Sequence, residues 1–73
     1  MFEYHLDKEI HRKQNFAREH AKCIDCLVLN AVLEQIEFCE ELGKGLTESQ
    51  ILKLLQLKSE IQVENFCHSL KIA

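Results

Sequence analysis

The stretch from Leu42 to Ile51 contains both glycines of the chain and separates two long segments with apolar residues at helical spacing. Gly43 can take the positive φ that ends a helix, because glycine has no Cβ to clash in that conformation. Thr47 and Gln50 have the spacing of a capping box, in which each side chain accepts a hydrogen bond from the other residue's backbone amide. The stretch therefore predicts that one helix ends and another begins within a few residues, as in an antiparallel helical hairpin.

The chain has 73 residues and no proline, and its composition favours uninterrupted helices on either side of this hinge. We predict an all-α fold, an antiparallel two-helix hairpin with helices near 16–42 and 48–71. Residues 1–14 form an N-terminal arm, which can form a short helix of its own, and residues 15–73 form the hairpin. A chain this short hides only about 60% of the surface that its unfolded form exposes. We therefore expect the fold to be completed by oligomerisation or by a partner.

The first predicted helix has apolar positions that alternate steps of four and three residues, the spacing of an a/d seam. This seam is expected to face the second helix. A polar residue in it, Gln35, either fixes the register or reaches past the seam to water. The seam consists of Ala17, Ala21, Ile24, Val28, Ala31, Gln35, Phe38 and Leu42.

Both predicted helices carry more apolar residues than a single hairpin mate can cover. We expect the excess to form a partner-binding surface; scattered surface leucines, which are common in soluble proteins, are the alternative. The predicted surface combines the outer face of the first helix with a stripe on the second. Its residues are Leu29, Leu33, Ile36, Leu54, Leu57 and Ile61.

The net charge of −3 gives no general attraction to nucleic acid. Residues 23–43, however, contain five acidic residues and no lysine or arginine. A partner that docks there should be basic or polar, and a solvated acidic face is the alternative. No apolar run approaches the ~20 residues of a membrane span, and the N-terminus lacks a signal pattern, so we expect a cytoplasmic protein without a membrane span.

The four cysteines include Cys23 and Cys26, whose two-residue gap occurs in zinc sites, where it normally lies on a turn. Here the gap is predicted to fall inside a helix, so we predict no metal and no cofactor. A site on His20, Cys23 and Cys26, which would share one helix face, stays open as an alternative. Cys39 and Cys67 fall on apolar faces and are predicted to pack as small hydrophobic residues. Because no catalytic constellation is found, we predict that the protein is not an enzyme.

The segment Ala17–Lys22 resembles the helix opening of small type III secretion co-chaperones, which hold the needle subunit in the bacterial cytosol together with a helical-repeat chaperone. Residues 55–66 resemble the second helix of that family, and the glycine-containing hinge lies at a similar distance. The resemblance covers residues 17–70. It implies a non-enzymatic adaptor whose exposed hairpin face contacts its co-chaperone and the needle subunit.

The turn Gly45-Leu46-Thr47 is also similar to that of the sporulation-type aspartyl-phosphate phosphatases, which are short helical hairpins. Their hallmark is Ser-Gln-x-x-Asp in the second helix. The equivalent stretch here, residues 55–59, reads Leu-Gln-Leu-Lys-Ser and lacks both the serine and the acid. This second resemblance therefore supports the fold and not the chemistry.

Together these features predict a small cytosolic protein-binding adaptor or co-chaperone that shields an amphipathic helix of a client, with the resemblance implying a role in type III secretion and virulence. The alternative is a homodimeric four-helix bundle that docks as a regulator on a kinase or transcription factor. In either case the predicted partner is another protein or a second copy of the chain.

Overall fold

The structure is a computed structural model that describes residues 6–22 and 24–72, with residues 71 and 72 described by their backbone only. It contains four helices and, among the described residues, no strand, which confirms the all-α class. The helices are α1 (Leu6–His20), α2 (Cys26–Glu41), α3 (Glu48–Leu54) and α4 (Glu60–Ile72).

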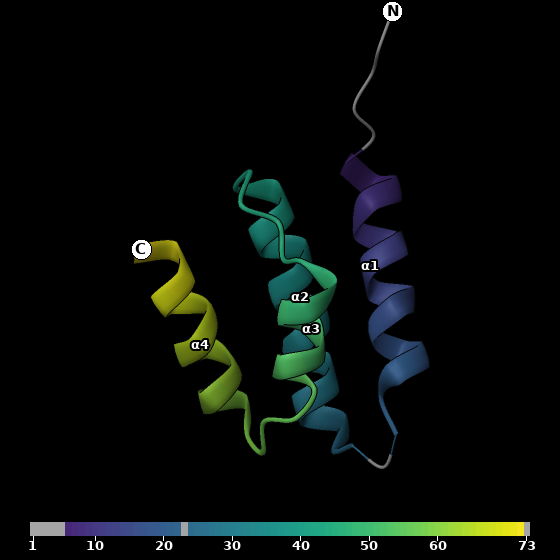
Figure 1. Cartoon of the computed structure of the whole chain (residues 1–73), viewed down its shortest axis with the longest axis vertical. Helices are drawn as coiled ribbons and strands as arrows, with labels where there is room; N and C mark the ends of the chain where they lie inside the picture. The colour runs from purple at the N-terminus through teal and green to yellow at the C-terminus, as the bar shows by residue number, and fades with distance from the viewer. Residues whose placement is uncertain (1–5, 23, 73) are drawn as a thin grey trace, which may run out of the picture.

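Helices α1, α2 and α4 lie side by side with α2 in the middle, and α3 lies in front of α2, where it contacts both α1 and α2 (Figure 1). The shortest dimension of the molecule is 17 Å. That dimension corresponds to two layers of helix, because packed helix axes lie about 8–10 Å apart. One broad side of α2 is therefore covered by α3, whereas no described helix lies over the opposite side.

The expected two-helix hairpin is wrong in its number of helices, because each predicted long helix is divided in two. The predicted helix 16–42 is interrupted at residues 21–25, and α1 continues through the expected boundary between residues 14 and 15. The physical reason is Asp25, whose side chain accepts a hydrogen bond of 2.7 Å from the Leu27 amide and caps α2. An N-cap residue needs an extended backbone, and Asp25 has φ −63° and ψ 135°.

The predicted helix 48–71 is interrupted at residues 55–59. Ser59 precedes α4, and its hydroxyl accepts a hydrogen bond of 3.3 Å from the Gln62 amide. The Gln62 side chain accepts a bond of 2.8 Å from the Lys58 amide, one residue before the usual position in a capping box. Serine followed three residues later by glutamine is a sequence signal for a helix start that our prediction did not use.

The glycine hinge has the predicted conformation. Gly43 has φ +78°, and its amide donates to the Glu40 carbonyl at 3.1 Å, while the Lys44 amide donates to the Cys39 carbonyl at 3.0 Å. These two bonds form a Schellman motif, which satisfies carbonyls that the helix end leaves without partners. The prediction that a helix ends at this glycine is confirmed.

The predicted capping box is also present. The Gln50 amide donates to Thr47 Oγ1 at 3.2 Å, and the Thr47 amide donates to Gln50 Oε1 at 2.9 Å. Leu46 before the cap and Ile51 in the first turn are both buried in the core, where the spacing of a hydrophobic staple places them.

A buried ion pair joins α1 to α2. Lys13 Nζ lies 2.6 Å from Glu40 Oε2, and the two side chains are only 12% and 8% exposed. The connection between α2 and α3 covers this pair at Gly45, where a Cβ would overlap the Glu40 carboxylate and lie 2.7 Å from Lys13 Nζ. Gly45 therefore permits the close approach of the loop. A second contact between α1 and α2 is a hydrogen bond of 3.1 Å, which Gln14 Nε2 donates to the Leu33 carbonyl.

The core is centred on a different face of α2 from the predicted seam. Val28 and Ala31 of the predicted seam are buried, and so are Val32 and Ile36 beside it, whereas the seam residues Phe38 and Leu42 are 49% and 54% exposed. The buried arc is therefore rotated by roughly 70° from the predicted seam about the helix axis, at 3.6 residues per turn. The seam was inferred for a helix with one mate, but α2 packs against α1, α3 and α4, so its buried arc is centred opposite the uncovered side.

The break before α2 can be tested by a substitution at Asp25, because the change in the free energy of unfolding should have opposite signs with and without the break. Because Asp25 caps α2, Asp25→Ala is expected to lower the free energy of unfolding by about 1 kcal/mol. In a continuous helix the same change would raise it slightly, because alanine has the higher helix propensity. Urea denaturation followed by circular dichroism measures the difference, and an increase in stability would contradict the observed break.

Candidate protein-binding surface

The three predicted surface residues of the first helix do not form an exposed face. Ile36 is fully buried in the core. Leu29 and Leu33 are partly buried, and Leu33 packs against the core cluster. The predicted surface on this helix is therefore corrected, because the rotation of α2 turns these residues inward.

The predicted stripe on the second helix is also divided. Leu54 is fully buried at the end of α3. Leu57 lies in the connection between α3 and α4 and packs partly buried against the core. Ile61 is 67% exposed on α4. Because the helix breaks between Leu54 and Glu60, the three side chains do not share a helix face.

The side of α2 that α3 leaves uncovered carries seven exposed residues, which we call the α2 outer face. At 3.6 residues per turn they lie within an arc of about 140°. Three of them are large and apolar: Leu27 is 60%, Phe38 49% and Leu42 54% exposed. The α2 outer face consists of Leu27, Asn30, Glu34, Glu37, Phe38, Glu41 and Leu42.

The carboxylates of the α2 outer face are unfavourably placed for helix stability. Glu34, Glu37 and Glu41 are spaced three and four residues apart, where like charges destabilise a helix by about 0.2–0.5 kcal/mol per pair. Glu41 also lies in the last turn of α2, where the helix dipole disfavours negative charge. Within the described part of the chain, none of the three forms a side-chain hydrogen bond or an ion pair.

The other exposed large apolar residues are isolated. Leu52 is 38% exposed on α3, and Ile61 projects from α4, where Glu64 and Asn65, one turn further along, are exposed polar residues. Single exposed apolar residues are ordinary features of protein surfaces. The α2 outer face differs from them because Phe38 and the C-cap residue Leu42 lie one turn apart, and Leu27 lies on the same face nearer the start of α2.

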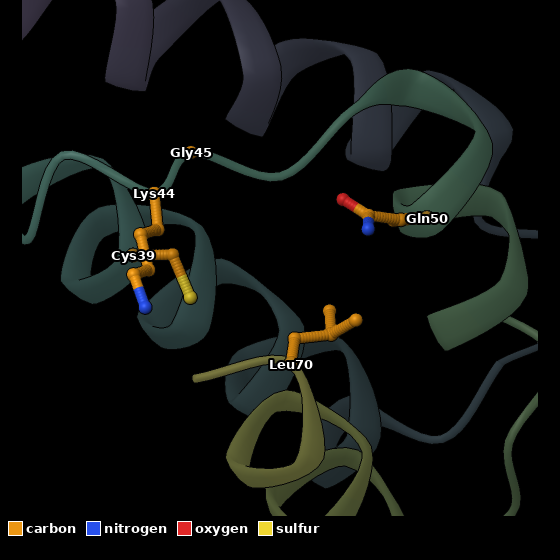
Figure 2. Close-up of a pocket in the computed structure, with 5 residues that line it drawn as sticks. All are labelled: Cys39, Lys44, Gly45, Gln50 and Leu70. Carbon is orange, nitrogen blue, oxygen red and sulfur yellow. The ribbon is translucent and has the colours of Figure 1, made fainter. Parts of the chain in front are cut away.

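A hollow of about 190 Å³ lies between the end of α2, the loop before α3, and α4 (Figure 2). Cys39, Gln50 and Leu70 line it together with the loop residues Lys44 and Gly45. Its volume is below the ~300–1,000 Å³ of typical cofactor and ligand sites. The hollow therefore has room for a single side chain rather than for an organic cofactor.

Two further hollows, of about 290 and 160 Å³, lie at the other end of α2 and share Asp25, Val28 and Lys58. Leu27 of the α2 outer face lines the smaller one. Their volumes are also below the ~300–1,000 Å³ of typical small-molecule sites. We therefore take the α2 outer face, and not a pocket, as the candidate functional site.

The metal alternative loses the helix face on which it depended. His20 is the last residue of α1, with Nδ1 2.9 Å from the Phe16 carbonyl and its ring 4.2 Å from the Phe16 ring. Cys26 is the first residue of α2 and is exposed, and Cys23 lies outside the described residues. His20 and Cys26 therefore belong to different helices and do not share one helix face, which corrects the prediction. In the described ranges no three His, Cys, Asp or Glu residues are grouped as metal ligands would be.

Cys39 and Cys67 are 2% and 0% exposed in the core, as the sequence predicted for small hydrophobic residues.

None of the described helices has the length and apolar character needed to cross a membrane. Comparison of the chain with protein-family models, with curated proteins and with solved structures finds no match.

Proposed function

We propose that this protein is a small, non-enzymatic protein-binding adaptor that covers a helical segment of a partner with the α2 outer face. The observation that carries the proposal is the exposure of Leu27, Phe38 and Leu42 on a side of α2 that no described element covers. Surfaces that combine several exposed apolar residues mark interaction sites in soluble proteins.

The size of this surface indicates how tightly it binds. Fully burying a leucine or phenylalanine contributes about 1.5–3 kcal/mol, so three side chains that are about half exposed contribute roughly 3 kcal/mol together. A micromolar complex needs about 8 kcal/mol after the loss of translational and rotational freedom. The apolar residues therefore supply only part of the affinity, and the proposed complex also needs polar contacts to the carboxylates of the same face.

The co-chaperone role implied by the resemblance is one form of this adaptor. In that form the partner is an amphipathic helix of a secreted subunit, and binding stabilises it by mass action because its apolar side is withdrawn from water. The bacterial cytoplasm is the compartment that this form requires. The exposure of Leu27, Phe38 and Leu42 supports proposing the surface on α2 rather than on a hairpin face.

Site-specific photo-crosslinking tests the proposal. A photo-reactive phenylalanine analogue at Leu42 is expected to give one discrete adduct in native cells, because the side chain is exposed on the proposed surface. The same analogue at Asn65, exposed on α4, is the matched control and should give no such adduct. Circular dichroism verifies that both variants fold.

A competition experiment tests whether the adduct forms through the α2 outer face. Excess unlabelled wild-type protein in a lysate should suppress the adduct, whereas a Phe38→Ser/Leu42→Ser variant should not. If the adduct is absent, or if the double variant competes as well as the wild type, the α2 outer face is not the binding surface.

A further inference from the structure

We propose that the partner segment is a basic amphipathic helix, in which lysine or arginine side chains lie between apolar ones. This inference rests on the proposed function and adds the chemistry of the partner. It is carried by the order of residues along the α2 outer face, by the lack of an ion pair at its carboxylates within the described residues, and by the poor fit of a second copy of the chain.

The order of residues defines what a complementary helix must present. Leu27 lies near the start of α2, and Phe38 and Leu42 lie one turn apart near its other end, about 16 Å and 22 Å away at 1.5 Å per residue. Glu34 and Glu37 lie between these apolar ends. A partner helix of about the length of α2 can cover this face when its apolar residues lie toward both ends and its polar residues lie between them.

The carboxylates of the α2 outer face determine which charge the polar residues of the partner helix should carry. Glu34, Glu37 and Glu41 have no ion pair within the described chain, and α2 itself contains no lysine or arginine. A cation placed over them would offset their mutual repulsion and the unfavourable position of Glu41 at the C-terminal end of the helix dipole. An acidic partner would increase both penalties, so complementarity favours lysine or arginine.

A second copy of the chain does not supply this combination through α2 or α1. Two α2 outer faces would bring six carboxylates together. The exposed positions of α1, from Asp7 to His20, include cations but no large apolar residue. One of those cations, Arg12, is already bound to Glu9 at 2.9 Å, and this hydrogen bond lowers the pKa of the Glu9 carboxyl.

The remaining helices fit no better. The exposed positions of α4 between residues 60 and 69 contain Ile61 but no lysine or arginine, and those of α3 contain one large apolar residue, Leu52, and one basic residue, Lys53. No described helix of a second copy therefore offers several cations together with several large apolar side chains. The proposed occupant is accordingly a different protein.

Synthetic helices test the inference with the full-length protein. Three peptides of 16 residues, the length of α2, are compared by isothermal titration calorimetry at low and physiological salt. The first combines leucine and lysine in an amphipathic pattern, the second replaces lysine by glutamate, and the third replaces leucine by serine. The leucine–lysine peptide is expected to bind at least about tenfold more tightly than either of the others, because only it satisfies both the apolar and the charged groups.

Matched variants locate the binding site. Replacing Glu34, Glu37 and Glu41 by glutamine is expected to weaken binding of the leucine–lysine peptide about tenfold at low salt and less at high salt. The control replaces three exposed glutamates elsewhere, Glu19, Glu60 and Glu64, by glutamine, which gives the same net charge and should leave affinity within about twofold. Phe38→Ser/Leu42→Ser should weaken binding at both salt concentrations.

Several results would overturn the inference. Equal weakening by the two glutamine triples would mean general charge attraction, and equal binding of the leucine–glutamate peptide would remove the basic requirement. Sedimentation showing a dimer that Leu42→Ser dissociates would identify a second copy as the occupant. If crosslinking at Leu42 succeeds while the leucine–lysine peptide does not bind, the proposed function stands and the chemistry inferred for the partner is wrong.

Discussion

Replacing Lys13 by methionine is expected to lower the free energy of unfolding by about 3 kcal/mol or more. The Glu40 carboxylate is 8% exposed and its 2.6 Å contact with Lys13 Nζ joins α1 to α2. Removal of one member of a buried ion pair leaves the other charge in a poorly solvated site, which typically costs about 3–5 kcal/mol. For a small domain, whose total stability is about 5–15 kcal/mol, this is a large fraction.

Urea denaturation monitored by circular dichroism measures this effect. Lys8→Met, at an exposed position of the same helix, removes the same charge from the surface and should change stability by less than about 0.5 kcal/mol. The double variant Lys13→Met/Glu40→Leu should recover much of the loss, because replacing both partners removes the unpaired charge. Equal stabilities of the Lys13 and Lys8 variants would show that the pair does not join the two helices.

Truncation of Ile36 to alanine is expected to lower the free energy of unfolding by about 2–5 kcal/mol. Ile36 is fully buried where α2 faces the rest of the core, so the change removes apolar contacts and leaves a cavity. The sequence alone placed Ile36 on an outward face, for which the expected change is within about 0.5 kcal/mol. The measurement therefore tests the rotation of α2 as well as its packing.

Phe38→Ala is the companion measurement. Phe38 is 49% exposed, and its truncation should change stability by less than about 1 kcal/mol, whereas burial in the predicted seam would make the loss about 3–5 kcal/mol. The slope of the denaturation curve should be unchanged in both variants if each remains a two-state folder. A larger loss for Phe38→Ala than for Ile36→Ala would contradict the observed orientation of α2.

The sequence alone predicted the charge of the candidate surface but not which apolar residues form it. The absence of lysine and arginine from residues 23–43 is visible in the sequence, and it indicated a basic or polar partner. The same sequence assigned Phe38 and Leu42 to the interior and Ile36 and Leu54 to the surface. Periodicity identifies which residues share a helix face, but it does not state which face another helix covers.

The sequence by itself determined the all-α class and the hinge between α2 and α3. Gly43, Thr47 and Gln50 form their motifs with neighbours within a few residues, so local chemistry is sufficient to specify them. The caps at Asp25 and Ser59 are equally local, and their signals were present in the sequence although our prediction did not use them.

The tertiary structure decided which side of α2 is buried. A helix in the middle of a layer packs against neighbours on several sides, and the positions of α1, α3 and α4 together define its buried arc. The contact between Lys13 and Glu40 also depends on the tertiary structure, because 27 residues separate them along the chain. Only the packing of the helices brings such groups together, and only that packing leaves Leu27, Phe38 and Leu42 exposed on the α2 outer face.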